Sequence, residues 1–88
     1  MTTKAWTVQV SIDEQGDDTI ADAVISLDNK MEVRGHGRSR RNPADQSDSR
    51  IGDELATARA LSDLAHQLLA TAATDIESRT HVPATLTL

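Results

Sequence analysis

Residues 5–12, AWTVQVSI, alternate strictly between apolar and polar side chains. The apolar members are Trp6, Val8, Val10 and Ile12, and the polar face carries Gln9 and Ser11. A two-residue period of this kind is typical of an antiparallel strand with one buried face. The stretch therefore predicts a strand over residues about 5–12, with Trp6 in the core or in a dimer interface.

Two more strands follow. Residues 13–18, DEQGDD, form a polar turn in which Gly16 is available for a positive φ. Residues 19–27, TIADAVISL, predict a second strand, although Ile20 and Val24 point away from its main apolar face. Residues 28–30 predict a tight turn, and a shorter third strand is expected over about 31–35. Together these segments predict a three-stranded antiparallel meander.

A long helix is expected over residues about 50–78, and Asp48 or Ser49 is placed to cap its start. Its apolar positions recur at three- and four-residue steps. They are Ile51, Leu55, Ala58, Leu61, Ala65, Leu68, Ala72 and Ile76. Such a helix would be about 40 Å long and would overrun strands of about 25 Å. Either it breaks near 71–75, where Thr74-x-x-Glu77 resembles a capping box, or its far end packs on another chain.

The tail, residues 79–88, contains Pro83 as a stop and then alternates Thr with Leu. Leu86 and Leu88 predict a short C-terminal strand, which would be added to a partner's sheet. Residues 1–88 are thus expected to form a single α+β domain, with one sheet face uncovered and an excess of helix.

Composition indicates that this domain needs a partner. The chain has 88 residues, one Trp, no Phe, no Tyr and no Cys, and much of its apolar content is Ala. A core of this kind is thin, and disulfides are unavailable to support it. A homodimer is the commonest supplement. The expected interface residues are Trp6, Ile20, Val24, Leu69, Ile76, Leu86 and Leu88.

Residues 36–50 are expected to form a basic loop in an acidic protein. The formal net charge is −5, yet residues 34–50 hold five Arg against Asp45 and Asp48, a local net charge of +3. Gly35 and Gly37 would let backbone amides approach an anion closely. Arginine forks suit bidentate phosphate contacts, so the candidate RNA or anion contacts are His36, Arg38, Arg40 and Arg41. The alternative is a solvated loop whose arginines pair with the protein's own carboxylates.

Nothing in the sequence predicts catalysis. The three histidines, His36, His66 and His81, match no metal-binding spacing, and no nucleophile elbow is present. We expect no enzyme activity, no cofactor, no metal and no small-molecule substrate. No signal peptide or membrane-spanning stretch is visible, so a cytoplasmic location without membrane attachment is expected.

The segment from Gly35 to Glu77 resembles a family of small actinobacterial proteins filed as a domain of unknown function. The family pattern reads G-x-G, a basic pair, N-P-x-D, I-G-D-E-L-A and R-A-L-x-D-L-A. In this chain those motifs are Gly35–Gly37, Arg40-Arg41, residues 42–45, residues 51–56 and residues 59–65. Asn42-Pro43 is equally explained by turn chemistry, and Gly52 by a helix start that packs closely.

The resemblance implies a fold grouped with double-stranded-RNA-binding domains and a tight homodimer. It also implies that some mycobacterial relatives belong to the hypoxia and dormancy response, with a dimer that resembles the hibernation-promoting factors that bind the small ribosomal subunit. A dimer of this chain would carry twice −5, or −10, which opposes association with RNA except at the arginine loops. Two functions are therefore expected: a stress-linked protein that contacts ribosomal or structured RNA, or a homodimeric protein-interaction module without nucleic-acid binding.

Overall fold

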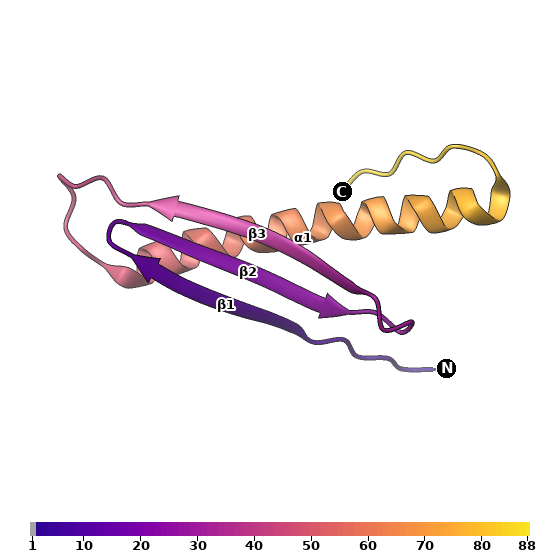
Figure 1. The fold of residues 1–88 in the computed structure, drawn as a ribbon, viewed down its shortest axis with the longest axis horizontal. Coiled ribbons are helices and arrows are strands. Elements are labelled where there is room, and N and C mark those ends of the chain that lie inside the picture. Colours follow the sequence, from indigo (N-terminus) through magenta and orange to yellow (C-terminus); the bar gives the residue numbers. More distant parts are fainter. Residues whose placement is uncertain (1) are drawn as a thin grey trace.

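The computed structural model describes residues 2–88 as an antiparallel sheet followed by one long helix (Figure 1). The strands are β1 (Val8–Gln15), β2 (Asp18–Ser26) and β3 (Glu32–Arg40), in the order β1-β2-β3. The helix α1 spans Ser49–Thr80. The predicted α+β fold, a three-stranded meander followed by a long helix, is confirmed.

Both turns of the meander have the predicted chemistry. Gly16 has a φ of 63°, in the left-handed region, and closes the hairpin between β1 and β2. In the second turn the Lys30 amide donates to the Leu27 carbonyl, and the Leu27 amide donates to the Met31 carbonyl. The Asn29 side chain accepts a further bond from the Met31 amide. These local bonds fix which residues face each other across the sheet.

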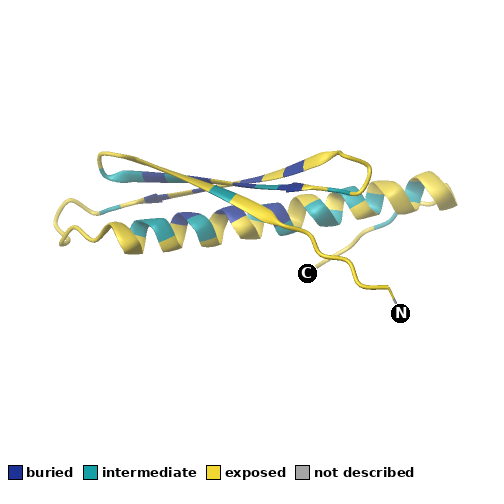
Figure 2. Ribbon diagram, turned by 90° about the horizontal axis from the view of Figure 1, so that it is seen from below, coloured by how far each residue is buried: buried dark blue, intermediate teal, exposed yellow. Residues whose placement is uncertain are grey.

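The register separates the two faces of the sheet. Ala23 of β2 lies between Val10 and Gly35, and Ala21 lies between Ile12 and Gly37, so these residues share the inner face. On this face and on the facing helix lies the hydrophobic core. It consists of Ala21, Ala23, Ile25, Val33, Ala56, Ala60 and Leu64. Figure 2 shows the buried positions gathered where the middle of the sheet meets the first half of α1.

Glycines in β3 bring the helix unusually close to the sheet. A Cβ built at Gly35 would overlap the Ala60 carbonyl and the Leu64 amide, and one at Gly37 would overlap the Ala56 carbonyl and the Ala60 amide. Gly52 plays the same part from the helix, because its Cβ would meet Thr19 Oγ1 at 2.8 Å. The close packing predicted for Gly52 is therefore confirmed. The expectation that Gly35 and Gly37 cradle an anion is wrong, because their open face is filled by helix backbone.

Only part of the predicted apolar stripe packs on the sheet. The buried row is Ala56, Ala60 and Leu64, at steps of four residues. Of the larger side chains of the predicted stripe, Leu68 packs partly against the core, whereas Ile51, Leu55, Leu61 and Ile76 stay exposed. Gly35 and Gly37 lie against the helix backbone at Ala56, Ala60 and Leu64, so this side of the helix packs on the sheet. The larger residues on its other sides are left uncovered.

Two boundaries differ from the sequence prediction in a way that matters for the site. The third strand continues to Arg40, not to residue 35, and the loop covers residues 41–48. His36, Arg38 and Arg40 therefore lie on a strand and not in a loop. The sequence predicts that the strand ends at the G-x-G, but both glycines lie inside β3, where close approach of the helix requires them.

The helix is continuous, so the expected alternative of a break near 71–75 is not observed. Asp48 caps its start by accepting a bond from the Arg50 amide, as predicted, and His81 ends it in a left-handed conformation. Thr74 does not act as a cap: its hydroxyl donates to the Ala70 carbonyl within the helix. At 32 residues the helix is about 48 Å long and extends beyond the sheet (Figure 1).

The C-terminal strand is not formed within the described residues of this chain. Residues 83–88 have no regular secondary structure and turn back along the second half of α1 (Figure 1). The Ala84 amide donates to Glu77 Oε1, which ties the start of the tail to the helix end. The tail has no neighbouring strand among the described residues of its own chain, because α1 extends beyond the end of the meander before the tail begins (Figure 1).

Candidate functional site

A row of basic side chains, three arginines and one histidine, follows the outer face of β3, on the side of the sheet away from the helix. Arg34, His36, Arg38 and Arg40 alternate with residues of the inner face and so point the same way. The structure thus places three of the four predicted RNA contacts in one line. Arg34, which lies just outside the predicted loop, extends that line.

Each member of this row has a carboxylate beside it. Arg38 lies 2.9 Å from Asp18 Oδ2, and Arg40 lies 3.9 Å from Asp18 Oδ1. His36 Nδ1 is 2.9 Å from Asp22 Oδ1, and Arg34 is 2.8 Å from Glu32. A phosphate would have to compete with these internal partners, so the row is locally neutralised.

Arg41, the fourth predicted contact, is a structural clasp. Its guanidinium donates to Asp17 Oδ1 at 2.7 Å and to the Asp45 carbonyl at 2.6 Å, while its backbone amide donates to the Asp17 carbonyl. Only about a third of its side chain (34%) is exposed. These bonds fasten the loop at residues 41–48 to the turn between β1 and β2. Asn42 completes the loop by accepting a bond from the Ala44 amide, as predicted for turn chemistry.

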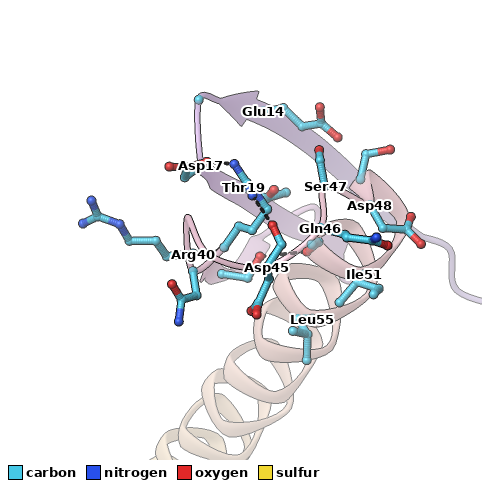
Figure 3. Close-up of a pocket in the computed structure, with 16 residues that line it drawn as sticks. Glu14, Asp17, Thr19, Arg40, Asp45, Gln46, Ser47, Asp48, Ile51 and Leu55 are labelled. Carbon is cyan, nitrogen blue, oxygen red and sulfur yellow. Dashed lines mark hydrogen bonds and ion pairs between the residues drawn. The ribbon is translucent and has the colours of Figure 1, made fainter.

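A cavity of about 220 Å³ lies between that loop, the turn after β1 and the start of α1. Figure 3 shows Asp17, Asp45, Ser47 and Arg40 around it, with Ile51 and Leu55 on the helix side. Its charged lining holds four carboxylates, Glu14, Asp17, Asp45 and Asp48, against Arg40 and the engaged Arg41. The cavity is therefore acidic and does not suit an anion.

The outer edge of β3 is closed by two helix side chains. Asp63 Oδ2 accepts a 2.8 Å bond from the His36 amide, and Arg59 donates a 2.7 Å bond to the Arg38 carbonyl. The His36 amide lowers the pKa of the Asp63 carboxyl below its ordinary value, with a smaller contribution from Gln67. Arg59 and Asp63 both belong to the R-A-L-x-D-L-A motif, so part of that motif serves to cover a sheet edge.

The opposite side of the molecule is open and apolar. The helix lies under β2 and β3 and barely touches β1, and every residue of β1 except Val10 is exposed. Ile12 and Leu61, exposed by 46% and 42%, line a shallow groove together with Ala58. We define the apolar flank as the exposed apolar residues of the β1 inner face and of the adjoining helix side: Val8, Ile12, Ala58 and Leu61.

The apolar flank contains one unsatisfied polar atom. Asp53 lines the groove, and its Oδ1 is buried without a hydrogen-bond partner among the described residues. Buried carboxylate oxygens are normally paired, because an unpaired one loses its hydration without compensation. A donor arriving with an associated chain would satisfy this oxygen.

The residues expected in a dimer interface are dispersed over the structure. Trp6 precedes β1, is 51% exposed and donates its indole N–H to Asp28, so it is not a core residue. Hydrogen bonds from Lys4 and then Trp6 lower the pKa of Asp28. Ile20 and Val24 are half-buried on the outer face, and Leu69 is half-buried on the helix. Ile76, Leu86 and Leu88 are exposed at the far end of the helix and in the tail.

The sequence does not predict that Val8, Ile12 and Leu61 form a surface. A signal was present, because the first-strand face and the helix stripe were both recognised as apolar. With one amphipathic helix on one sheet face, each of these two apolar faces is expected to bury the other. Within residues 2–88, no group of His, Cys, Asp and Glu is placed to hold a metal, and no helix has the length and apolarity needed to cross a membrane.

Comparison with known proteins gives one consistent result. The model of the Rv2632c-like family matches residues 4–85. The chain is 49% identical over 81 residues to the uncharacterized protein Mb1767 of Mycobacterium bovis, covering 92% of this chain and 85% of that protein. It is 48% identical over 82 residues to the uncharacterized protein Rv2632c of Mycobacterium tuberculosis, covering 93% and 87%. The crystal structure of Rv2632c superposes with a TM-score of 0.84 at 44% identity, covering 94% of this chain and 98% of that one.

Proposed function

Because the chain belongs to the Rv2632c-like family, whose named relatives are uncharacterised, we propose a function from the surface it presents. The protein is a non-enzymatic, cytoplasmic, homodimeric protein-interaction module. The observation that carries this proposal is the apolar flank, where Ile12 and Leu61 remain nearly half exposed beside an unsatisfied Asp53 oxygen.

The small core explains why a second copy is needed. No large side chain is fully buried within the described residues, and the four completely buried apolar residues are all alanines. They are Ala21, Ala23, Ala56 and Ala60. Since stabilisation grows with the apolar area removed from water, alanines contribute little. A domain of this size with such a core normally gains the missing burial from a partner subunit.

A second copy fits the apolar flank better than an unrelated partner does. In a two-fold dimer the same patch meets itself, so the Leu, Ile and Val side chains of one copy would cover those of the other. The inner face of β1 and the adjoining side of α1 would then both be covered by apolar residues of the second copy. The outer face of the sheet, with its mixed charges, would remain free for a protein partner.

The test is the oligomeric state in solution. We expect light scattering after gel filtration to give twice the mass of 9.5 kDa at tens of micromolar protein. Leu61→Glu places a charge in the flank and should give a monomer that keeps its helical circular dichroism. Gln9→Glu adds the same charge on the outer face of β1 and should remain a dimer. A wild-type protein that is monomeric at these concentrations would overturn the proposal.

A second candidate is contact with ribosomal or structured RNA by a dimer similar to the hibernation-promoting factors, in a stress or dormancy response. The observation that favours it is the line of Arg34, His36, Arg38 and Arg40 along one strand. Phosphate contacts by such a row would make binding weaken steeply with salt. The internal carboxylate partners of these residues, and the net charge of −5 per chain, weigh against it.

Co-sedimentation with purified ribosomes separates the two candidates. The variant to use is Arg34→Gln with Arg38→Gln and Arg40→Gln, because it leaves the Arg41 clasp intact. Arg79→Gln changes a cation at the far end of the helix and serves as the control. Wild-type binding that falls with salt and is lost in the triple variant alone would support RNA contact. Wild-type protein that stays at the top of the gradient at low salt would eliminate this candidate.

A further inference from the structure

The free edge of β1 exposes backbone groups of the same residues that form the apolar flank. On β3, the His36 amide and the Arg38 carbonyl point away from the sheet, toward the helix side chains that bind them. Antiparallel ladders alternate bonded and outward-facing residues. Following the register across β2, the outward-facing backbone groups of β1 belong to Val8, Val10 and Ile12.

The two edges of the sheet therefore differ. Arg59 and Asp63 cover the edge of β3, and such covering prevents another strand from pairing there. No side chain of the described residues bonds to the backbone of β1 in a corresponding way. A strand that added to β1 would gain main-chain hydrogen bonds and would bury the side chains of Val8 and Ile12 at the same time.

From this asymmetry we infer that the edge of β1 is a strand-addition site, and that its occupant is the C-terminal segment Pro83–Leu88 of a second copy. The inference rests on the proposed homodimer and names the part of the partner that completes the sheet. The segment reads PATLTL, alternates apolar with polar residues, and leaves Leu88 76% exposed in the single chain. Six extended residues span about 20 Å, which matches the apolar part of β1.

The direction of the tail also fits. Figure 1 shows β1 running opposite to α1, so that β1 ends where the helix begins. If the apolar flanks meet about a two-fold axis perpendicular to α1, the two helices run antiparallel. The partner's helix then ends beyond the end of β1, because Thr80 lies 19 residues, or about 28 Å, past Leu61. The left-handed turn at His81, with a φ of 58°, sends the tail back along its own helix. The partner's tail would then run antiparallel to β1.

Side-chain alternation restricts how the strands pair. With Leu86 opposite Val10, Leu88 falls opposite Val8, and these apolar residues share the inner face. Thr85 then lies opposite Ser11 on the outer, polar face. A shift of two residues keeps the faces and places Thr87 opposite Ser11, whereas a shift of one would turn both leucines toward solvent.

The experiment uses cysteine pairs, since the chain has no native cysteine among the described residues or elsewhere in its sequence. Ser11→Cys protein is mixed with Thr85→Cys protein, and separately with Thr87→Cys protein, under mild oxidation. Directly opposed residues of paired strands lie within reach of a disulfide. We expect a mixed disulfide-linked dimer in one of the two mixtures, amounting to the majority of the protein.

Two further samples make the result decisive. Leu86→Cys mixed with Ser11→Cys should give at least tenfold less mixed disulfide, because the two side chains would lie on opposite faces of the sheet. Protein ending at Val82 should dimerise at least tenfold more weakly than the full chain. Wild-type protein that is dimeric but forms neither threonine-linked product would overturn the tail inference alone. A self-linked dimer of Ser11→Cys would assign the edge to β1 of the second copy and would also overturn it. Monomeric wild-type protein would overturn the homodimer itself.

Discussion

The carboxylate of Asp63 and the backbone amide of His36 join the helix to the edge of the sheet, with 2.8 Å between the oxygen and the nitrogen. Twenty-seven residues separate the two positions along the chain. The contact gives an edge-strand amide a protein partner in place of water. Together with the bond from Arg59 to the Arg38 carbonyl, it determines which edge of the sheet remains available for association.

Replacing Asp63 should loosen that edge. In Asp63→Ala the His36 amide loses its acceptor, so its hydrogen exchange should become faster while exchange in the β1–β2 hairpin stays unchanged. Asp75→Ala removes an exposed carboxylate from the same helix beyond the sheet and is the matched control. Equal protection of the His36 amide in wild type and Asp63→Ala would show that the carboxylate does not hold the edge in solution.

The same bond predicts a component of acid sensitivity. The His36 amide lowers the folded-state pKa of Asp63 below its ordinary value of 3.8. A lowered pKa contributes stability that is present above the unfolded-state value and is lost as the pH falls through the folded-state value. Asp63→Asn keeps an acceptor oxygen but cannot titrate. The difference in urea midpoint between wild type and Asp63→Asn should therefore shrink from pH 7 to pH 3, and a difference that stays constant would contradict this account.

The close contact between β3 and α1 predicts a strong effect of a single methyl group. Gly37→Ala would push a Cβ into the Ala56 carbonyl, so the helix must move away from the sheet. Overpacking of this kind costs about 1–3 kcal/mol. For a domain of this size the midpoint Tm should fall by roughly 4–8 °C for each kcal/mol. Thermal unfolding followed by circular dichroism provides the measurement.

Gly16→Asn is the control for that experiment. Gly16 has a positive φ of 63°, but nothing lies within 4 Å of a Cβ built there. Asn tolerates this conformation better than other side chains do. If Gly16→Asn lowered the Tm as much as Gly37→Ala does, the loss at both sites would come from backbone conformation and not from contact with the helix.

The sequence predicted the elements better than it predicted their contacts. Period-two alternation identified β1, and helical spacing identified α1, because each pattern is local. The G-x-G was assigned to a loop, since nothing local distinguishes a glycine that ends a strand from one that admits a helix. The role of Gly35 depends on Ala60, 25 positions away, and such a pairing is visible only in three dimensions.

The candidate surfaces likewise depend on contacts between residues that lie far apart in the sequence. Arginines at alternate positions 34, 38 and 40 carry a strand period, which could have indicated that β3 continues through them. The carboxylate partner of Arg38 and Arg40 is Asp18 on β2, which follows from the register and not from sequence proximity, whereas Arg34 pairs with Glu32 of its own strand. The apolar flank is not predicted for a related reason: Ala56, Ala60 and Leu64 of α1 pack on the sheet, so Leu61 remains outside.

Arg41 should matter to stability more than its neighbour does. Arg41→Gln removes the bonds to Asp17 and to the Asp45 carbonyl and should lower the free energy of unfolding by about 1 kcal/mol. The Arg40 side chain is 72% exposed and lies 3.9 Å from Asp18. Arg40→Gln should therefore change the free energy of unfolding little. Urea unfolding of the two variants measures the difference. Equal midpoints would mean that the clasp contributes nothing, and Arg41 would again be available as a surface cation.

Salt should strengthen the proposed dimer. Each chain has a formal net charge of −5, so two chains repel each other at long range, whereas the apolar flank contributes no ion pairs across the interface. Raising the ionic strength shortens the screening length to about 8 Å at 0.15 M and reduces this repulsion. Sedimentation equilibrium should therefore give a dissociation constant that falls between 20 mM and 300 mM NaCl. A constant that rises over this range would mean that ion pairs such as those of the β3 arginines hold the two copies together, and the interface would then have to be placed on the outer face of the sheet.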